Sequence, residues 1–213
     1  MTVFFWFSHF DLNAKITKFV NAIVRKNEIR RLAMQKRSNL SVTEIEALSS
    51  KITSLLLEKF NFSQLKISCF ASMQAKNEVN TIPLINALCD TNEVYLPVSN
   101  FTNSSMSHGR YQPGDLLIEN RYGIPEPLQP QVSLNSADFD VVIVPVLAVD
   151  IHGNRVGYGK GFYDRFIAEC KADVMTIGLH FFEPFNELPV EPNDRALKYL
   201  ITPNQCYTFN EVQ

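Results

Sequence analysis

The stretch from Asp140 to Ile167 constrains the fold more than any other part of the chain. It begins with the apolar, β-branched run Val141–Val144, which is typical of a strand buried on both faces of a sheet. Pro145 cannot donate a ladder hydrogen bond, so the strand should end there. Apolar side chains at helical spacing follow, which predicts a helix that begins near Gly161. The stretch therefore predicts a strand, a loop and a helix in succession.

Glycines and charges are concentrated in that loop. Four of the chain's eight glycines lie within nine residues, at Gly153, Gly157, Gly159 and Gly161. Such glycines let successive backbone N–H groups turn toward one point, and a helix N-terminus adds unpaired N–H groups. Arg155 and Lys160 add positive charge, while Asp164 suits a phosphate that carries Mg2+ better than a bare one. The pattern favours a phosphate site, and an ordinary glycine-rich turn is the alternative.

The loop matches neither of the two common phosphate-binding loops. A P-loop has four residues between its glycines and a Ser or Thr after its Lys. Here five residues separate Gly153 from Gly159, and Gly161 follows Lys160. The dinucleotide fingerprint places its first glycine directly after the strand, whereas Gly153 comes nine residues after Val144.

Residues 14–37 predict one helix that is rich in Lys and Arg and has Glu28 as its one acid. Lys26 and Arg30 are four residues apart and share a face of it. One interpretation is that this shared face lets Lys26 and Arg30 bind a polyphosphate. The alternative is a solvated basic helix, and that interpretation holds for most of its cations.

Strands and helices alternate along the rest of the chain. Residues 41–60, with Ser41 and Glu44 as a capping box, and residues 81–89 predict helices. Strands are expected at residues 65–72, 93–98, 106–111, 174–182 and 197–202, and the proline-rich residues 113–131 are expected to form an ordered loop. This order predicts an α/β fold, a three-layer sandwich with a mostly parallel central sheet flanked by helices on both faces. Ligands of such sheets bind outside the carboxyl ends of the strands.

Composition excludes several classes of protein. The net charge of −2 does not suit an electrostatic nucleic-acid binder, and no apolar run is long enough for a transmembrane helix. The first ten residues lack the basic start and cleavage site of a signal peptide. The four cysteines show no CxxC and are expected to be reduced thiols of a cytoplasmic protein. The four histidines form no HExxH, so no zinc site is expected.

The segment VPVLAVDIHGNRVGYGKGFYDRF, residues 144–166, resembles the signature of the 5-formyltetrahydrofolate cyclo-ligase family, also called methenyltetrahydrofolate synthetases. Four shorter segments are similar to other motifs of this family: KNEIR at 26–30, FASMQAKNEV at 70–79, YGIPEP at 122–127 and PNDRALKYLIT at 192–202. The likeness covers roughly residues 26–202. We therefore expect an extension at residues 1–25 and a single cyclo-ligase-like domain at residues 26–213.

The resemblance implies an enzyme that uses ATP and Mg2+ to convert 5-formyltetrahydrofolate to 5,10-methenyltetrahydrofolate, with release of ADP and phosphate. The γ-phosphoryl group would move to the formyl oxygen, which then leaves as phosphate when the neighbouring folate nitrogen closes the ring. Such a transfer depends on positioning and charge neutralisation more than on covalent help from the protein.

The resemblance also implies a set of site residues. Lys160, Arg155 and Tyr163 would be catalytic, and Asp164 and Asp194 would hold Mg2+. ATP would be bound by Lys26, Asn27, Glu28, Ile29 and Arg30, and by Arg155, Val156, Gly157, Tyr158, Gly159, Lys160, Gly161, Phe162 and Tyr163. The folate would be bound by Ala71, Glu78, Met106, Tyr122, Tyr158, Gly159, Lys160, Gly161 and Phe162.

Three residues depart from the family pattern. Val149 stands where an aromatic residue is common, and Ala71 stands where a larger apolar residue is expected, so either would alter the pterin pocket. Tyr158 stands where Arg is frequent, which removes one cation from the ATP site. The phosphate-facing residues are otherwise intact.

Three other functions are alternatives to this one. A relative could keep the fold and the nucleotide site but serve other cofactor metabolism or regulation. A phosphosugar isomerase or CoA-transferase type of enzyme on a similar sheet would not require ATP. An RNA-binding module is the least favoured, because no aromatic and basic platform accompanies the basic helix. We expect a monomer that acts in the cytoplasm on 5-formyltetrahydrofolate and ATP and binds neither nucleic acid nor membrane.

Overall fold

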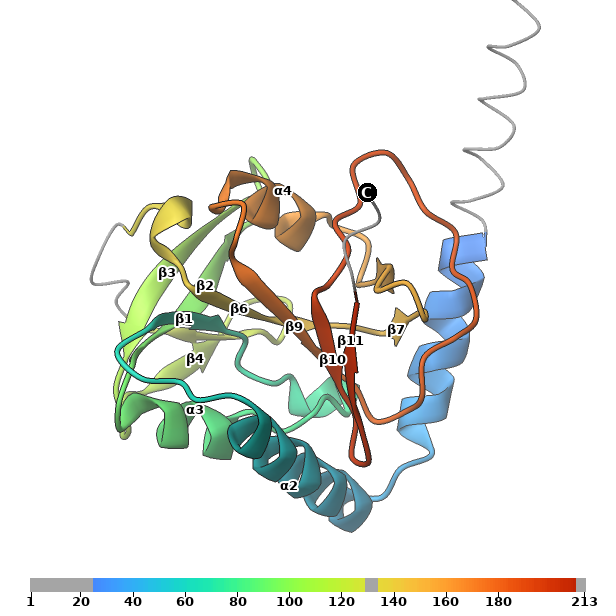
Figure 1. Ribbon diagram of the computed structural model, residues 1–213, viewed down its shortest axis with the longest axis horizontal. Coiled ribbons are helices and arrows are strands. Elements are labelled where there is room, and N and C mark those ends of the chain that lie inside the picture. The colour runs from blue at the N-terminus through green and yellow to red at the C-terminus, as the bar shows by residue number, and fades with distance from the viewer. Residues whose placement is uncertain (1–24, 129–133, 210–213) are drawn as a thin grey trace, which may run out of the picture.

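A computed structural model describes residues 25–128 and 134–209 of the chain (Figure 1). Within these ranges one sheet contains β1 (Lys66–Cys69), β2 (Glu93–Asn100), β3 (Ser105–Tyr111), β6 (Val141–Pro145), β9 (Met175–Leu179), β10 (Tyr199–Ile201) and β11 (Cys206–Thr208). Their order is β11-β10-β9-β6-β1-β2-β3. The strands from β10 to β2 run parallel, and the two edge strands β3 and β11 are antiparallel to their neighbours. The predicted mostly parallel sheet is confirmed.

Helices cover both faces of this sheet. Figure 1 shows α2 (Val42–Lys59) and α3 (Ile82–Cys89) below it and α4 (Phe162–Glu169) above it. The alternation of β6 explains the two layers: Val141 and Ile143 face the α2 and α3 side, while Val142 and Val144 face α4. All four are buried, which is why this strand has no polar residue. The three-layer α/β prediction is confirmed.

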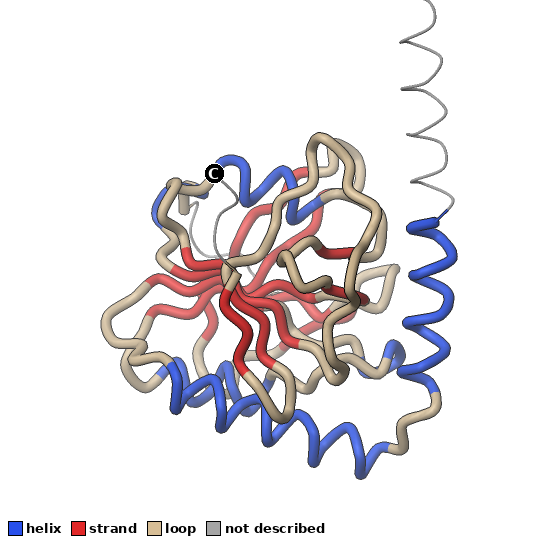
Figure 2. Tube along the Cα trace, turned by 45° about the vertical axis from the view of Figure 1, so that its right-hand side comes forward, coloured by secondary structure: helices blue, strands red, loops and turns tan. Residues whose placement is uncertain are grey.

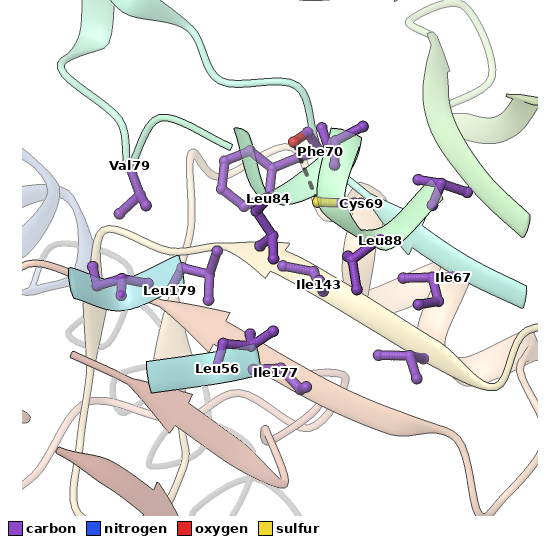
Figure 3. Close-up of a cluster of buried hydrophobic side chains, with 14 of the residues drawn as sticks. Leu56, Ile67, Cys69, Phe70, Val79, Leu84, Leu88, Ile143, Ile177 and Leu179 are labelled. Atoms are coloured by element: carbon purple, nitrogen blue, oxygen red, sulfur yellow. Dashed lines mark hydrogen bonds between the residues drawn. The ribbon is translucent and has the colours of Figure 1, made fainter. Parts of the chain in front are cut away.

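The largest cluster of buried hydrophobic residues in the described chain lies between the sheet and the helices α2 and α3. Figure 3 shows Leu56 of α2 and Leu84 and Leu88 of α3 against the sheet residues Ile143 and Ile177. The capping box predicted for α2 is present, with the Ser41 hydroxyl accepting from the Glu44 amide and the Glu44 carboxylate accepting from the Ser41 amide. That cap fixes the start of the helix whose buried side chains close this core.

The order of the strands places a crevice at one point of the sheet. From β1 the chain moves outward to β2, and from β6 it moves the other way to β9 and β10. β1 and β6 are direct neighbours, with Ile67 opposite Val141 and Cys69 opposite Ile143. The connections after β1 and after β6 therefore diverge, which is the usual place of a ligand site in a parallel sheet.

A helix at residues 25–38 borders this end of the sheet. Figure 2 shows it beside the loops rather than on either face of the sheet. Its side chains reach the glycine-rich loop, because Arg30 donates to the Gly157 carbonyl at 2.9 Å. The predicted helix over residues 14–37 is confirmed for its described part, and residues 14–24 lie outside the described residues.

Several local features differ from the expectation. β2 continues past Pro97 to Asn100, because β1 pairs only with residues 93–95 and beyond them the strand bonds to β3 alone. The proline-rich loop contains the hairpin β4 (Leu117–Glu119) and β5 (Pro125–Pro127), and the glycine-rich loop contains β7 (Ala148–Val149) and β8 (Arg155–Val156). The antiparallel edge strand β11 was not expected either. These pairings are two or three residues long and leave little periodic signal.

No helix in the described part of the chain is long and apolar enough to cross a membrane. The four cysteines are free thiols.

Gly153 closes the turn between β7 and β8 and should tolerate no side chain. Its φ is +83°, and a Cβ there would lie 2.7 Å from the Leu197 carbonyl oxygen and 2.8 Å from the Phe209 ring. Left-handed strain costs about 1–2 kcal/mol and overpacking about 1–3 kcal/mol. We expect Gly153→Ala to lower the free energy of unfolding in urea by about 3 kcal/mol.

Gly114 offers the matched control for this prediction. Its φ is +98°, but nothing lies within 4 Å of a Cβ there. Gly114→Ala should cost about 1 kcal/mol, from strain alone. Equal losses for the two variants would show that the contacts of Gly153 with Leu197 and Phe209 do not matter.

Candidate active site

A pocket opens at the carboxyl ends of β1 and β6, where the fold places its crevice. One wall is the segment from Arg155 to Asp164, and a second is Lys26 and Arg30 of the N-terminal helix. The remaining lining residues come from the segment after β1, from in or near β2, β3 and β5, from the end of β6 and from the segment before β10: Phe70, Ala71, Met73, Glu78, Pro97, Ser99, Met106, Ile124, Pro125, Pro145 and Asp194. The glycine-rich loop, the acidic loop and the proline-rich segment thus meet, as the sequence analysis predicts.

The backbone amides of the glycine-rich loop are available to a ligand. None of the amides of residues 157–164 donates a hydrogen bond to an acceptor in residues 25–128 or 134–209. Three of them belong to the first turn of α4, where a helix has no internal acceptor to offer. Free amides at a helix N-terminus are suited to bind an anion.

Two glycines of this loop have conformations that other residues rarely adopt. Gly159 has φ +87° and Gly161, the N-cap of α4, has φ +66°. A Cβ on Gly159 would come within 3.0 Å of the Arg30 guanidinium carbon, so its hydrogen lets that cation lie against the loop. Gly157 differs from these two, because its φ is not positive and nothing lies within 4 Å of a Cβ built on it.

Arg155 is one of three buried charged residues that line the pocket, with Lys26 and Glu78. Its side chain is 5% exposed, and its Nη2 donates to the Asp164 Oδ1 at 2.8 Å. Burial lowers the pKa of Arg155, while the charges of Asp164 and Asp194 oppose that shift. Its Nη1 is buried and has no hydrogen-bond partner in the described structure. An unpaired buried N–H of a charged group is costly, and an anion in the pocket would supply the missing acceptor.

A second buried cation, Lys26, is held by the segment between β9 and β10. Its Nζ lies 2.6 Å from Asp194 Oδ2 and 3.0 Å from Glu191 Oε1. Figure 1 shows this orange-red segment running along the N-terminal helix. The next backbone amide, that of Arg195, donates to Asp164 Oδ1 at 3.1 Å. Because Arg195 directly follows Asp194, this contact joins the two segments that carry the predicted metal-binding carboxylates.

Glu78 also lines the pocket and is 4% exposed. Its Oε2 accepts from the Met73 amide at 2.7 Å, and its Oε1 accepts from the Tyr158 hydroxyl at 2.6 Å. Burial raises the pKa of Glu78, whereas these two hydrogen bonds and the charges of Arg37 and Lys76 act to lower it.

Apolar and aromatic side chains surround the part of the pocket between Glu78 and the proline-rich segment. Phe101 lies against Tyr122, with ring centroids 3.8 Å apart, and meets Phe162 edge-on at 5.0 Å. Met106 and Ile124 line the same part. A flat heterocycle would find both apolar contact and an aromatic edge here.

The structure does not bring every predicted residue to the pocket. Asn27 and Glu28 are exposed on the outer side of their helix turn, and Ile29 packs against the small core of Ala148, Val156 and Leu188. Only Lys26 and Arg30, four residues apart, line the pocket from this helix. Tyr122 lies against Phe101 and is not among the lining residues, and Val149 is fully buried in the core beneath α4. The other predicted site residues line the pocket, and their roles stay predictions.

Sequence reasoning missed several residues of the site. Phe70, Met73, Pro97, Ser99, Ile124, Pro125 and Pro145 line the pocket, and Phe101 supports its aromatic side. Phe70 directly follows β1 and Pro145 ends β6, so the place of these two at the carboxyl edge was available as a signal. Arg37 was expected to be a solvated cation but is 2% exposed and contacts the site through Tyr158. No pattern in the sequence indicates that burial.

The carboxylates of the pocket fit a magnesium ion that arrives with a phosphate ligand. Among the residues that the structure describes, no group of three or more His, Cys, Asp and Glu side chains could hold a metal ion. Mg2+ is commonly bound by one or two carboxylates together with substrate phosphates. Asp164 and Asp194 supply such a pair, and the unpartnered Nη1 of Arg155 beside them fits the accompanying anion.

Comparison with known proteins places the chain in a family. The model of the 5-formyltetrahydrofolate cyclo-ligase family matches residues 22–203, which is most of the chain. The chain belongs to this family. It is 30% identical over 190 residues to the 5-formyltetrahydrofolate cyclo-ligase of Mycolicibacterium smegmatis, covering 84% of this chain and 94% of that protein. It is 34% identical over 179 residues to the enzyme of the same name from Haemophilus influenzae, covering 76% of this chain and 95% of that one.

Solved structures agree with this membership. The 5,10-methenyltetrahydrofolate synthetase of Aquifex aeolicus matches 88% of this chain and 94% of its own with a TM-score of 0.72 and 30% identity. The protein of the same name from Mycoplasma pneumoniae has a TM-score of 0.66 at 21% identity and supports the fold alone. The resemblance found in the sequence motifs is therefore confirmed at the level of family and fold.

Lys26 should stabilise the folded chain through its two carboxylate partners. In Lys26→Met, Asp194 and Glu191 would face each other without a cation, and both are partly exposed. We expect a loss of about 1–2 kcal/mol in the free energy of unfolding at low salt, and less at high salt.

Arg25→Met is the matched control, because Arg25 lies next in the same helix and is exposed. It should change stability by less than about 0.5 kcal/mol. Indistinguishable unfolding curves for the two variants would mean that the ion pairs of Lys26 contribute nothing to the fold.

Proposed function

We propose that this protein converts 5-formyltetrahydrofolate to 5,10-methenyltetrahydrofolate with ATP and Mg2+, releasing ADP and phosphate. The single observation that carries the proposal is one pocket with two unlike ends. The unpaired N–H of Arg155 and the free amides of residues 157–164 lie at one end, and the buried carboxylate of Glu78 lies at the other. Family membership supports the reaction, and the pocket supports the two substrates.

The cationic end would hold the triphosphate. Lys26, Arg30 and Arg155 converge there from the N-terminal helix and from β8, and Lys160 lies exposed at the rim. Free loop amides add donors that cost no reorganisation when the phosphates arrive. Phosphoryl transfer needs this kind of positioning and charge neutralisation.

The other end would hold the folate. The pterin ring is flat and carries N–H donors, so it suits an aromatic wall with a carboxylate acceptor at its end. Phe162, Met106 and Ala71 would contact the ring, and Glu78 would accept from its N–H groups. The aromatic contact of Phe101 with Phe162 would keep that wall in place.

The reaction follows from bringing these two ends together. The formyl oxygen would attack the γ-phosphorus, and the bond to the β-phosphate oxygen breaks to release ADP. The neighbouring folate nitrogen then attacks the activated carbon, its proton is lost, and the former formyl oxygen leaves as inorganic phosphate. Arg155 and Lys160 would stabilise the charge on the moving phosphoryl group. Burial raises the pKa of Tyr163 well above its ordinary value, so its hydroxyl would act as a donor rather than a base.

The ion pairs of the pocket explain why magnesium would be needed. Arg155 is paired with Asp164 and Lys26 with Asp194, so phosphates that take the cations leave two carboxylates beside them. Asp164 and Asp194 would then hold Mg2+, which neutralises charge between the carboxylates and the phosphates. Without Mg2+, the negatively charged phosphates of ATP would lie next to the negatively charged carboxylates of Asp164 and Asp194.

The remaining expectations concern the setting of the enzyme. We propose a monomer that works in the cytoplasm and binds neither nucleic acid nor membrane. The net charge of −2 and the reduced cysteines support this.

One spectrophotometric assay tests the proposed activity. The purified protein should produce methenyltetrahydrofolate absorbance from 5-formyltetrahydrofolate in the presence of both ATP and Mg2+, with one ADP formed for each product molecule. Omission of either should stop the reaction. A folded protein that binds ATP but leaves 5-formyltetrahydrofolate unchanged would instead be a family relative with another role.

Asp164→Asn tests the proposed coupling between nucleotide and ion. The amide oxygen can still accept from Arg155 and from the Arg195 amide, so both hydrogen bonds should remain although the countercharge is lost. ATP affinity measured by calorimetry should rise on addition of Mg2+ in the unmodified protein. In Asp164→Asn the increase in ATP affinity on addition of Mg2+ should be smaller by about 10–100-fold.

Asp173→Asn is the control for this charge change, since Asp173 is exposed and lies outside the pocket lining. It should keep the full gain from Mg2+. A variant at Asp164 that keeps the gain as well would remove this residue from the proposed metal site.

A further inference from the structure

Arg37 is a buried cation that the proposed chemistry does not use. It lies near the end of the N-terminal helix, is 2% exposed and does not line the pocket. Its Nη2 donates to the Val146 carbonyl, and its Nη1 lies 3.3 Å from the Tyr158 hydroxyl oxygen. Its backbone carbonyl accepts from the Asn77 side chain at 3.1 Å, one residue before Glu78. These contacts join three separate segments behind the folate end of the pocket.

The Tyr158 hydroxyl connects this cation to Glu78. A phenol has one proton, and the distance of 2.6 Å to Glu78 Oε1 is that of a strong O–H to carboxylate bond. The proton therefore goes to Glu78, and the hydroxyl oxygen accepts from Arg37. A hydroxyl that accepts a hydrogen bond from a cation is a stronger donor. Both hydrogen bonds of this chain therefore run the same way, from Arg37 to Tyr158 and from Tyr158 to Glu78.

We propose that Arg37 and Tyr158 are positioning residues that keep Glu78 ionised and oriented as the acceptor for the N–H groups of the pterin ring. The inference rests on the proposed function, in which Glu78 contacts the folate. It also gives a role to Tyr158 at the position where the family often has Arg. The positive charge is supplied here by the N-terminal helix, and the hydroxyl carries its effect to the carboxylate.

Ionisation of Glu78 depends on few neighbours. Arg37 reaches it from the N-terminal helix, Lys76 from the turn before it, and Tyr158 and Tyr163 from the glycine-rich loop and α4. Burial raises the pKa of this carboxyl, and the Met73 amide, Tyr158, Arg37 and Lys76 oppose the rise, in that order. Loss of the hydroxyl or of the guanidinium should therefore raise the pKa further.

The direction of the pH effect follows from the acceptor role. A carboxylate accepts from ring N–H groups, whereas a protonated carboxyl presents a donor in the same place. Folate affinity should therefore fall as the pH falls through the pKa of Glu78. In variants with a higher pKa the fall should begin at a higher pH.

The test is calorimetric titration of 5-formyltetrahydrofolate, without ATP, into the unmodified protein, Tyr158→Phe, Arg37→Gln and Glu78→Gln. The titrations span about pH 5 to about pH 9, which brackets an ordinary and a raised carboxyl pKa. Loss of a charge-assisted hydrogen bond predicts about tenfold weaker binding near neutral pH in Tyr158→Phe and Arg37→Gln. Their acid limb should move to higher pH, and Glu78→Gln should bind weakly with no such limb.

Arg31→Gln is the matched control, because Arg31 is exposed on the same helix and loses the same charge. It should keep the affinity and the pH profile of the unmodified protein. Mg-ATP affinity separates positioning from general damage, since Arg37→Gln should change it by less than about twofold while folate affinity falls. Tyr158→Phe keeps the ring and decides the matter if Arg37→Gln does not fold.

The outcomes separate this inference from the function on which it rests. Unchanged folate affinity and an unchanged acid limb in Tyr158→Phe would overturn the inference and leave the proposed function standing. Equal losses of ATP and folate affinity in Arg37→Gln would show a merely structural role and also overturn it. If the unmodified protein bound no 5-formyltetrahydrofolate at any pH, both would fail.

Discussion

Burial of the Arg155 guanidinium is the constraint on which the rest of the site depends. A charge withdrawn from water needs a countercharge and a partner for each N–H group. Asp164 supplies the countercharge and thereby fixes the start of α4 against β8. The Arg195 amide joins the same carboxylate, which draws in the segment before β10. The Nη1 of Arg155 is left without a hydrogen-bond partner, and an anion bound in the pocket would supply one.

The sequence predicts those parts of the fold in which a periodic pattern reflects burial. Val141–Val144 is apolar throughout because both of its faces are covered, and the start and end of α2 follow from its cap and its apolar stripe. The hairpin of β7 and β8 could not be predicted in this way. Its strands are two residues long, and their position depends on Gly153 lying beneath Leu197, a contact between distant segments.

The site was predictable where chemistry and local spacing coincide. Gly159, Gly161 and Lys160 belong to one loop, and their availability to an anion can be seen in the order of the residues. The burial of Arg37 could not, because it depends on Val146 and Tyr158, which are more than a hundred positions away. Neither could the exposure of Asn27, since a motif marks a run of residues while a helix turns only some of them toward the pocket.

The position of the N-terminal helix has a consequence for how the molecule is divided. Neither face of the sheet requires this helix, because α2 and α3 cover one and α4 covers the other. Yet Lys26, Arg30 and Arg37 all come from it. The cover of the sheet and one wall of the pocket thus come from different stretches of the chain. A shortened chain that began after this helix would keep the cover on both faces of the sheet but lose Lys26, Arg30 and the buried contacts of Arg37, so an intact sheet would not by itself mean an intact pocket.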